Sequence, residues 1–156
     1  MATLALNFDV NVLRFITSPQ CSDCILTHCL IFGVHYTLTL DPLRNLETLQ
    51  FLELTNLKVD DDSLKPIAEI KSLLKLGISN QFKTEEYAFL SANMPQTECG
   101  MFKPYIELSQ LIGENDVMVV GRRKPFLNSK SDKNRIEKYA NEFNQLVHKY
   151  TFNKAI

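Results

Sequence analysis

Three cysteines and a histidine lie close together near the N-terminus. Cys21 and Cys24 are two residues apart, and His28 and Cys29 follow shortly after them. Thiolates and an imidazole together can complete a tetrahedral zinc site. However, no second CxxC or HxxxH follows, and cysteine is a common small buried residue. We therefore expect no metal and no cofactor, and we keep a zinc-stabilised domain that uses Cys21, Cys24 and Cys29 as a third hypothesis.

Arg122, Arg123 and Lys124 form a basic run directly after a glycine. Nucleic acid or another polyanion would be bound only if such charges gather on one face. Acidic residues at 137 and 142 dilute the basic character of the stretch that follows. The alternative hypothesis is therefore a regulator that binds nucleic acid or another polyanion through this basic zone, which extends to Lys130, Lys133, Arg135 and Lys138.

No arrangement typical of an enzyme stands out. The three histidines are scattered, and the sequence has no glycine-rich phosphate loop, Ser-His-Asp order or paired-carboxylate motif. The acidic run at residues 60–62 lacks the spaced oxygens and the glycine of a calcium loop, so an exposed turn is expected there. We expect no catalytic residues and a non-enzymatic role.

The composition is that of an ordinary globular chain. Its 156 residues are 45% hydrophobic and 22% charged, with a formal net charge of −1. Nothing in this balance attracts the whole chain to nucleic acid or to an anionic membrane. No run of eighteen apolar residues exists, and the apolar N-terminus is interrupted too often for a signal peptide. Four cysteines are too few for a disulfide scaffold, so a single-domain cytoplasmic protein is expected.

The spacing of the leucines indicates which elements hold these residues. Residues 40–56 read LDPLRNLETLQFLELTN and residues 64–80 read LKPIAEIKSLLKLGISN, and the two align at an offset of 24. Eight positions coincide, nearly all of them apolar. One step earlier, Leu30 falls under Leu54 and His28 falls under Leu52. An eroded third copy therefore precedes the two clear ones.

These segments resemble the leucine-rich repeat family. The pattern LxxLxL occurs at residues 49–54 and again at residues 73–78, and the period of 24 lies in the family's range. The resemblance implies short parallel strands with Leu52 and Leu54 pointing inward and a helical return limb before each strand. The family's usual asparagine is replaced by Leu57 and Gln81, so no regular asparagine ladder is expected. Asparagine falls one residue early, at positions 56 and 80.

The outward positions of these strands follow from alternation along each strand. The resemblance implies that the concave strand face binds proteins. Phe51 is an aromatic residue at a position on this face that should be exposed to solvent. Two bland explanations are a lone exposed phenylalanine without function, and a C-terminal helix that covers this face. The predicted partner-binding residues are Phe51, Glu53, Thr55, Lys75 and Ser79.

The remaining sequence predicts a cap. A short helix is expected from Thr84 as N-cap, with Tyr87, Leu90 and Met94 on its inner face. Residues 95–108 look extended, residues 116–121 look like a strand, and apolar residues at helical spacing predict a final helix over about 131–150. The predicted fold class is α/β, a short leucine-rich-repeat solenoid with parallel strands on one face and a helical C-terminal cap. Its parts are an N-terminal cap or degenerate repeat (1–23), the repeats (24–82) and the cap (83–156).

Overall fold

The structure, a computed structural model, describes residues 28–32 and 37–152. The chain divides into two compact units, and each is described by itself. The first unit runs to Ser79 and also includes residues 96–99, whereas the second comprises residues 80–95 and the chain from Gly100 onward. The predicted N-terminal part, residues 1–23, lies outside the described residues.

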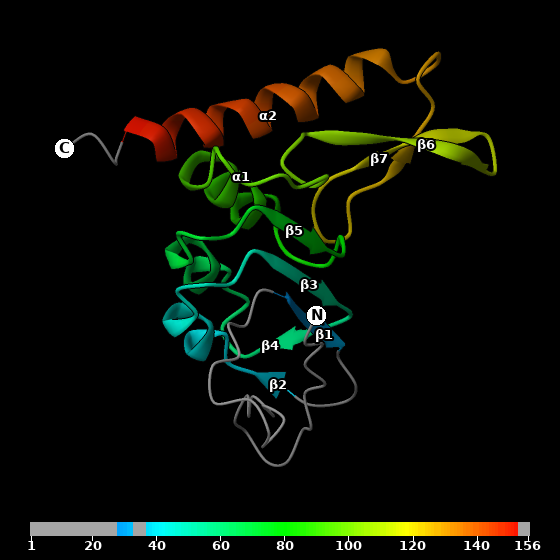
Figure 1. Ribbon diagram of the computed structural model, residues 1–156. Helices are drawn as coiled ribbons and strands as arrows, with labels where there is room; N and C mark the ends of the chain where they lie inside the picture. Colours follow the sequence, from blue (N-terminus) through cyan, green and yellow to red (C-terminus); the bar gives the residue numbers. More distant parts are fainter. Residues whose placement is uncertain (1–27, 33–36, 153–156) are drawn as a thin grey trace. The chain divides into compact units, whose positions relative to one another are not determined.

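The first unit contains a three-stranded parallel sheet in the order β1-β3-β5 (Figure 1). Two short 3-10 helices, η1 and η2, precede β3 and β5, and a two-stranded parallel pair, β2-β4, completes the unit. The bounds are β1 (His28–Phe32), β2 (Thr37–Leu38), η1 (Asp41–Asn45), β3 (Phe51–Thr55), β4 (Lys58–Val59), η2 (Lys65–Glu69) and β5 (Lys75–Ile78).

The register of this sheet agrees with the leucine alignment for one pair of strands and not for the other. Phe51 of β3 pairs with Lys75 of β5, which is the offset of 24 seen in the sequence. His28 of β1 pairs with Phe51, an offset of 23, so the prediction that His28 occupies the position equivalent to Leu52 is wrong by one residue. Cys29 is the residue that pairs with Leu52. Because side-chain direction alternates along a strand, a shift of one residue exchanges the two faces.

The three-residue leucine spacing has a simple cause. The backbone N–H of Leu43 donates to the carbonyl of Leu40, Leu46 to Leu43, and Leu49 to Leu46, at 3.0, 3.1 and 3.3 Å. These bonds define a tight helical limb with three residues per turn rather than an α-helix. Prolines sit in the first turn of both η1 and η2, where no backbone donor is needed. The same ladder recurs one period later through Leu64, Ile67, Ile70 and Leu73.

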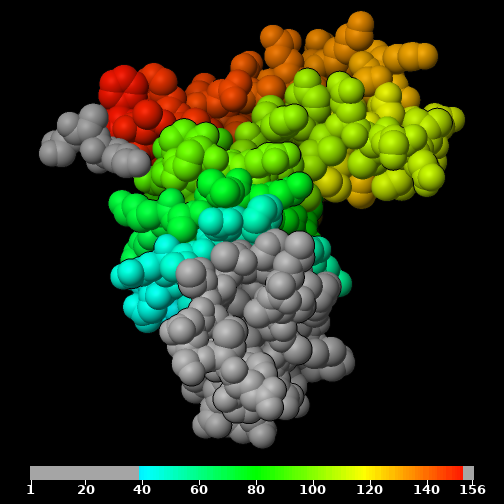
Figure 2. All heavy atoms as spheres, viewed as in Figure 1, coloured from blue at the N-terminus to red at the C-terminus, as the bar shows by residue number. Residues whose placement is uncertain are grey.

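The second unit combines two helices with a three-stranded antiparallel sheet in the order β6-β7-β8. A turn at Gly113, whose φ is +65°, joins β6 to β7. Buried Val117, Val119 and Leu127 form a small core against α2, together with three partly buried residues, Tyr105, Ile136 and Tyr139. Figures 1 and 2 show α2 lying along α1 and the hairpin. The bounds are α1 (Thr84–Asn93), β6 (Tyr105–Ile112), β7 (Asn115–Val119), β8 (Phe126–Leu127) and α2 (Lys133–Phe152).

The predicted fold class is wrong. We expected one solenoid closed by a helical cap, whereas the described residues form a mixed α/β structure with a small parallel sheet and a separate antiparallel sheet. The cause lies in residues 105–127. They form three strands with their own buried valines and leucine, so this part of the chain is a second sheet with its own core rather than the extended segment and single strand that we expected.

The helices of the second unit are close to those expected. The final helix is present as α2, and its apolar stripe is buried or half-buried while the intervening residues are exposed. The role given to Thr84 as an N-cap is wrong, because Thr84 is the first residue of α1 and no side-chain cap is formed. Its buried hydroxyl instead donates to the carbonyl oxygen of Val120 at 3.0 Å.

Candidate functional site

The exposed face of the parallel sheet lies over a row of buried leucines. Along β3, Leu52 and Leu54 are buried, Glu53 is exposed, and Phe51 and Thr55 are half-buried. The register places Phe51 beside Lys75, which is exposed. The alternation expected from the sequence therefore brings an aromatic ring and an ammonium group onto neighbouring strands.

Glu53 reaches across the neighbouring strand because that strand has a glycine opposite it. Glu53 pairs with Gly77, and the Cγ atom of Glu53 lies only 3.2 Å from the place where a Cβ atom on Gly77 would be. A side chain at position 77 would push the carboxylate away from β5. The glycine thus lets Glu53 lie flat on the sheet beside the Phe51–Lys75 row.

A segment from later in the chain extends this row by one residue. Glu98 forms a parallel bridge with Lys75, its backbone N–H donates to the Leu74 carbonyl at 2.8 Å, and its carbonyl accepts from the Leu76 N–H at 2.9 Å. The buried Thr97 hydroxyl adds a hydrogen bond of 2.7 Å to the Leu73 carbonyl. Glu98 is exposed, and it could not be predicted as part of the row because no leucine pattern marks this segment.

We call Phe51, Glu53, Lys75 and Glu98 the strand-face patch. Two of the predicted partner-binding residues lie at its edge. The Ser79 hydroxyl accepts a hydrogen bond of 3.2 Å from the backbone N–H of Asn56. Asn56 has a φ of +52°, so this bond helps to hold the turn after β3. Thr55 is half-buried next to that turn.

The basic zone is only partly available for binding. Arg122 and Arg123 are exposed, but the Lys124 ammonium lies 3.5 Å from a carboxylate oxygen of Glu142 and 4.9 Å from the centre of the Tyr139 ring. Farther along, Arg135 pairs with Asp132 at 2.9 Å. These local pairs neutralise part of the positive charge of the basic zone.

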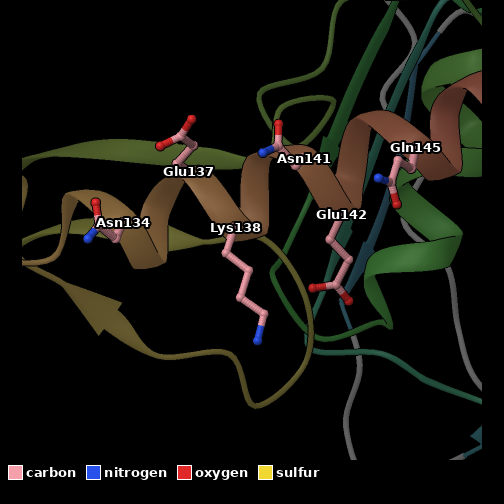
Figure 3. A pocket seen from close by; sticks show the side chains of 6 residues that line it. All are labelled: Asn134, Glu137, Lys138, Asn141, Glu142 and Gln145. Atoms are coloured by element: carbon pink, nitrogen blue, oxygen red, sulfur yellow. The ribbon is translucent and has the colours of Figure 1, made fainter.

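A shallow hollow on α2 is polar and built from one helix. Figure 3 shows that the side chains of Glu137 and Asn141 extend to one side of the helix and those of Lys138 and Glu142 to the other. They do not converge on a common point. The hollow is therefore a solvated helix surface, lined by Asn134, Glu137, Lys138, Asn141, Glu142 and Gln145.

The zinc hypothesis rests mostly on residues that the structure does not describe. Cys21 and Cys24 lie outside the described residues, and Cys29 is placed only through its pairing in β1. Within the described residues, no group of three His, Cys, Asp or Glu side chains is arranged to hold a metal ion. In the same part of the chain, no helix is both long enough and apolar enough to cross a bilayer.

Comparisons with known proteins find none that is similar to this chain. No protein-family model matches the sequence. Comparisons with the curated proteins and with the solved structures likewise find no match. The resemblance to leucine-rich repeats therefore rests on the sequence pattern alone, and a functional argument has to come from the geometry of this chain.

Asp116 fixes the loop that leads into α2. Its carboxylate accepts hydrogen bonds from the Ser129 backbone N–H at 2.7 Å and from the Ser129 hydroxyl. The side-chain bond from Ser129, followed by the backbone bond, lowers the pKa of Asp116 below its usual 3.8. Asp132 behaves in the same way, because the Asn128 N–H and then the Arg135 guanidinium lower its pKa.

The second unit should therefore lose stability in acid through Asp116. A carboxyl group whose pKa is lowered by folding stabilises the folded state above the unfolded value of 3.8, and this contribution disappears as the pH falls through the lower folded value. We expect Asp116→Asn to lower the urea midpoint at pH 7, and the difference from the wild type to shrink below pH 3.8. Glu137→Gln, an exposed change on α2, is the control. An Asp116→Asn deficit that stays constant down to pH 2 would contradict this role.

Proposed function

We propose that the protein is a non-enzymatic, cytoplasmic interaction module that binds another protein through the strand-face patch. The observation that carries the proposal is the in-register row of Phe51 on β3, Lys75 on β5 and Glu98, which pairs with Lys75 through an isolated bridge. Aromatic residues are enriched at the energetic centres of protein interfaces, with polar and charged groups around them. The patch has this composition.

The support beneath the patch favours binding without rearrangement. Leu52, Leu54 and Leu76 are buried directly under the exposed residues, and backbone hydrogen bonds link β5 to β3 and to Glu98. A surface that is already ordered loses little conformational entropy when a partner docks. The patch carries two carboxylates and one ammonium group, so we expect a partner with an apolar side chain for Phe51 and basic or amide groups around it.

The decisive variant is Phe51→Asp. It removes the half-buried ring and adds a third carboxylate to the patch, and we expect the affinity for a partner captured with the wild-type protein to fall roughly tenfold or more. Lys71→Glu, which changes an exposed charge in the loop before β5, should leave the affinity unchanged. The dissociation constants are measured by titration with the purified partner.

A cross-linking experiment locates the interface directly. A photoreactive amino acid in place of Glu53 should form a covalent adduct with the partner. The same amino acid in place of the exposed Glu47 should not. Equal affinity of the Phe51→Asp variant and the wild type, together with adducts at position 47 alone, would refute the proposal.

A further inference from the structure

The first half of β6 has an open edge. In the sheet order β6-β7-β8, β6 is an edge strand, and no other described strand pairs with its outer side. The Val120 N–H donates to the Pro104 carbonyl at 3.0 Å, so this carbonyl and, two residues on, the backbone groups of Ile106 face β7. Because the direction of these groups alternates along a strand, those of Tyr105 and Glu107 face outward. Within the described residues, no hydrogen bond engages these outward groups.

This edge is regular and has little protection against pairing with another strand. Soluble proteins usually protect exposed edge strands with lysine, proline, short length or a bulge. The sequence of β6 is YIELSQLI, with no lysine, no proline and one charged residue, Glu107. The register between β6 and β7 becomes irregular only after Glu107, so residues 105–107 keep the geometry of a regular strand. An extended segment can therefore pair with them.

A groove runs along the same edge, between β6 and α2. One hollow, of about 740 Å³, is lined by residues 103–107 and by Asn144 of α2. A second hollow, of about 370 Å³, shares Tyr105, Glu107 and Ala140 with the first, so the two adjoin. Residues at helical spacing form the α2 side of the groove. They are Lys133, Glu137, Ala140 and Asn144.

The lining of the second hollow suits a long basic side chain. Two carboxylates, those of Glu107 on β6 and Glu137 on α2, line it together with one ammonium group, that of Lys133. No ion pair or hydrogen bond with another described residue engages these three charges. The methylenes of a lysine or arginine can lie on the apolar part of the hollow while the charged head lies at the carboxylates, and the Tyr105 ring can add a cation–π contact. The apolar part consists of Tyr105, Val117, Ile136 and Ala140.

We propose that this groove binds an extended, basic segment of another protein, which adds as a strand to the open edge of β6. The outward backbone groups of Tyr105 and Glu107 hydrogen-bond the backbone of the segment. Directly opposed residues on neighbouring strands have their side chains on the same face of a sheet. A lysine or arginine opposite Tyr105 or Glu107 therefore points into the second hollow, which both of these residues line.

Charge decides the occupant of the groove. The second hollow offers its ligand two carboxylates and one ammonium group, which favours a cationic side chain over an anionic one. Lys103, in the first hollow, disfavours a second basic residue at that end. The segment is therefore expected to carry one basic residue among β-branched residues, which favour strands, and not a continuous basic run. This surface lies in the second unit, so the proposal does not rest on the strand-face patch.

A pair of short peptides tests the charge preference. Each is capped at both ends and alternates threonine and valine, with a central arginine in one and a central glutamate in the other. Titrated into the isotope-labelled full chain, the arginine peptide should shift the amide resonances of Tyr105 and Glu107 in a saturable way. The glutamate peptide should bind about fivefold more weakly. Phe51→Asp should leave both affinities unchanged.

Reversing one charge in the groove should exchange the preference. Glu137→Lys should weaken binding of the arginine peptide about fivefold and strengthen binding of the glutamate peptide. Glu114→Lys is the matched control, because it makes the same change in net charge at an exposed residue that does not line the groove. Circular dichroism verifies that each variant is folded.

Two N-methylated forms of the arginine peptide test strand addition. One carries the methyl group on the nitrogen of the arginine, and the other carries it on the nitrogen of the next residue. In an added strand only alternate N–H groups face β6. One form should therefore bind about fivefold more weakly than the parent peptide, whereas the other should bind as the parent does.

Three results would overturn the proposal. The first is a wild-type protein that does not bind the arginine peptide up to millimolar concentration. The second is equal affinity for the arginine and glutamate peptides, or an affinity that Glu137→Lys and Glu114→Lys change alike. The third is a pair of methylated forms that both bind as the parent does, because a ligand that does not pair with the edge of β6 would behave in that way.

Discussion

Replacing Gly121 by alanine is expected to lower the free energy of unfolding of the second unit by about 3–5 kcal/mol. Gly121 is buried and has a φ of +133°, a conformation that residues with a side chain rarely adopt. A Cβ atom there would overlap the hydroxyl oxygen of Thr84 and would lie 3.0 Å from Cγ of Lys124. Backbone strain and steric overlap therefore act together.

The surroundings of Gly121 cannot easily relax. Its backbone N–H donates to the side-chain oxygen of Asn80 at 2.7 Å, and the Thr84 hydroxyl donates to the preceding carbonyl, that of Val120, at 3.0 Å. On the other side, the Arg122 N–H donates to the Phe82 carbonyl at 2.6 Å. The chain is held to the start of α1 on both sides of the glycine, so moving away from Thr84 would break at least one of these bonds.

Gly100 provides the matched control for this substitution. A Cβ atom at Gly100 would have no other atom within 4 Å, and its φ is not positive. Gly100→Ala should change the urea midpoint little, whereas Gly121→Ala should lower it strongly. In the double variant Thr84→Ala/Gly121→Ala, the overlap with the hydroxyl oxygen is removed, so the loss should be smaller than the sum of the single losses. Equal midpoints for the two single glycine variants would show that the turn is not constrained in this way.

The sequence predicted the first unit best where one pattern repeats at short range. Leu49, Leu52 and Leu54 recur 24 residues later, so the alternation of β3 and β5 and their register follow from the alignment. The tight helical limbs were also visible in the three-residue spacing, once that spacing is read as three residues per turn. The register of β1 was missed because its apolar positions match too few of the later ones to exclude a shift of one residue.

The second unit was harder to predict because its contacts are long-range. Pro104 argues against a central strand, and β6, which begins at the next residue, is an edge strand of its sheet. The polar residues of β6 hide its alternation. Gly113 between two apolar runs was a usable hairpin signal, and its φ of +65° shows why glycine stands there. No local pattern predicts that Asn80 and Thr84, about forty residues earlier in the chain, anchor residues 119–121.

The candidate site likewise contains residues that a short-range pattern predicts and residues that only tertiary contacts bring to it. Phe51, Glu53 and Lys75 could be placed on one face from alternation alone. Glu98 could not, because it joins the row through backbone bonds to a strand more than twenty residues away. For the same reason, the sequence did not show that Ser79 holds a turn or that Lys124 pairs with Glu142. These partners are set by tertiary structure.

Adjacent leucines in the first unit should differ sharply when truncated. Leu73 is 0% exposed and Leu74 is 51% exposed. Leu73→Ala removes a side chain that the packed interior surrounds, and we expect it to cost about 2–5 kcal/mol. Leu74→Ala removes a side chain that is largely in water, and we expect a change within about 0.5 kcal/mol. Both free energies of unfolding are obtained from urea titrations followed by circular dichroism.

This pair also tests the register, because the two substitutions are chemically identical and differ only in which way the side chain points. Leu73 ends the ladder of N–H to carbonyl bonds that runs from Leu64, and the next buried position is Leu76, in β5. A slip of one residue in this segment would turn Leu74 inward and Leu73 outward. The ranking of the two variants would then invert, and the neighbouring exposed position, Lys75, would leave the strand-face patch. A cost at Leu73 that exceeds the cost at Leu74 is therefore a condition for the proposed binding surface as well as for the fold beneath it.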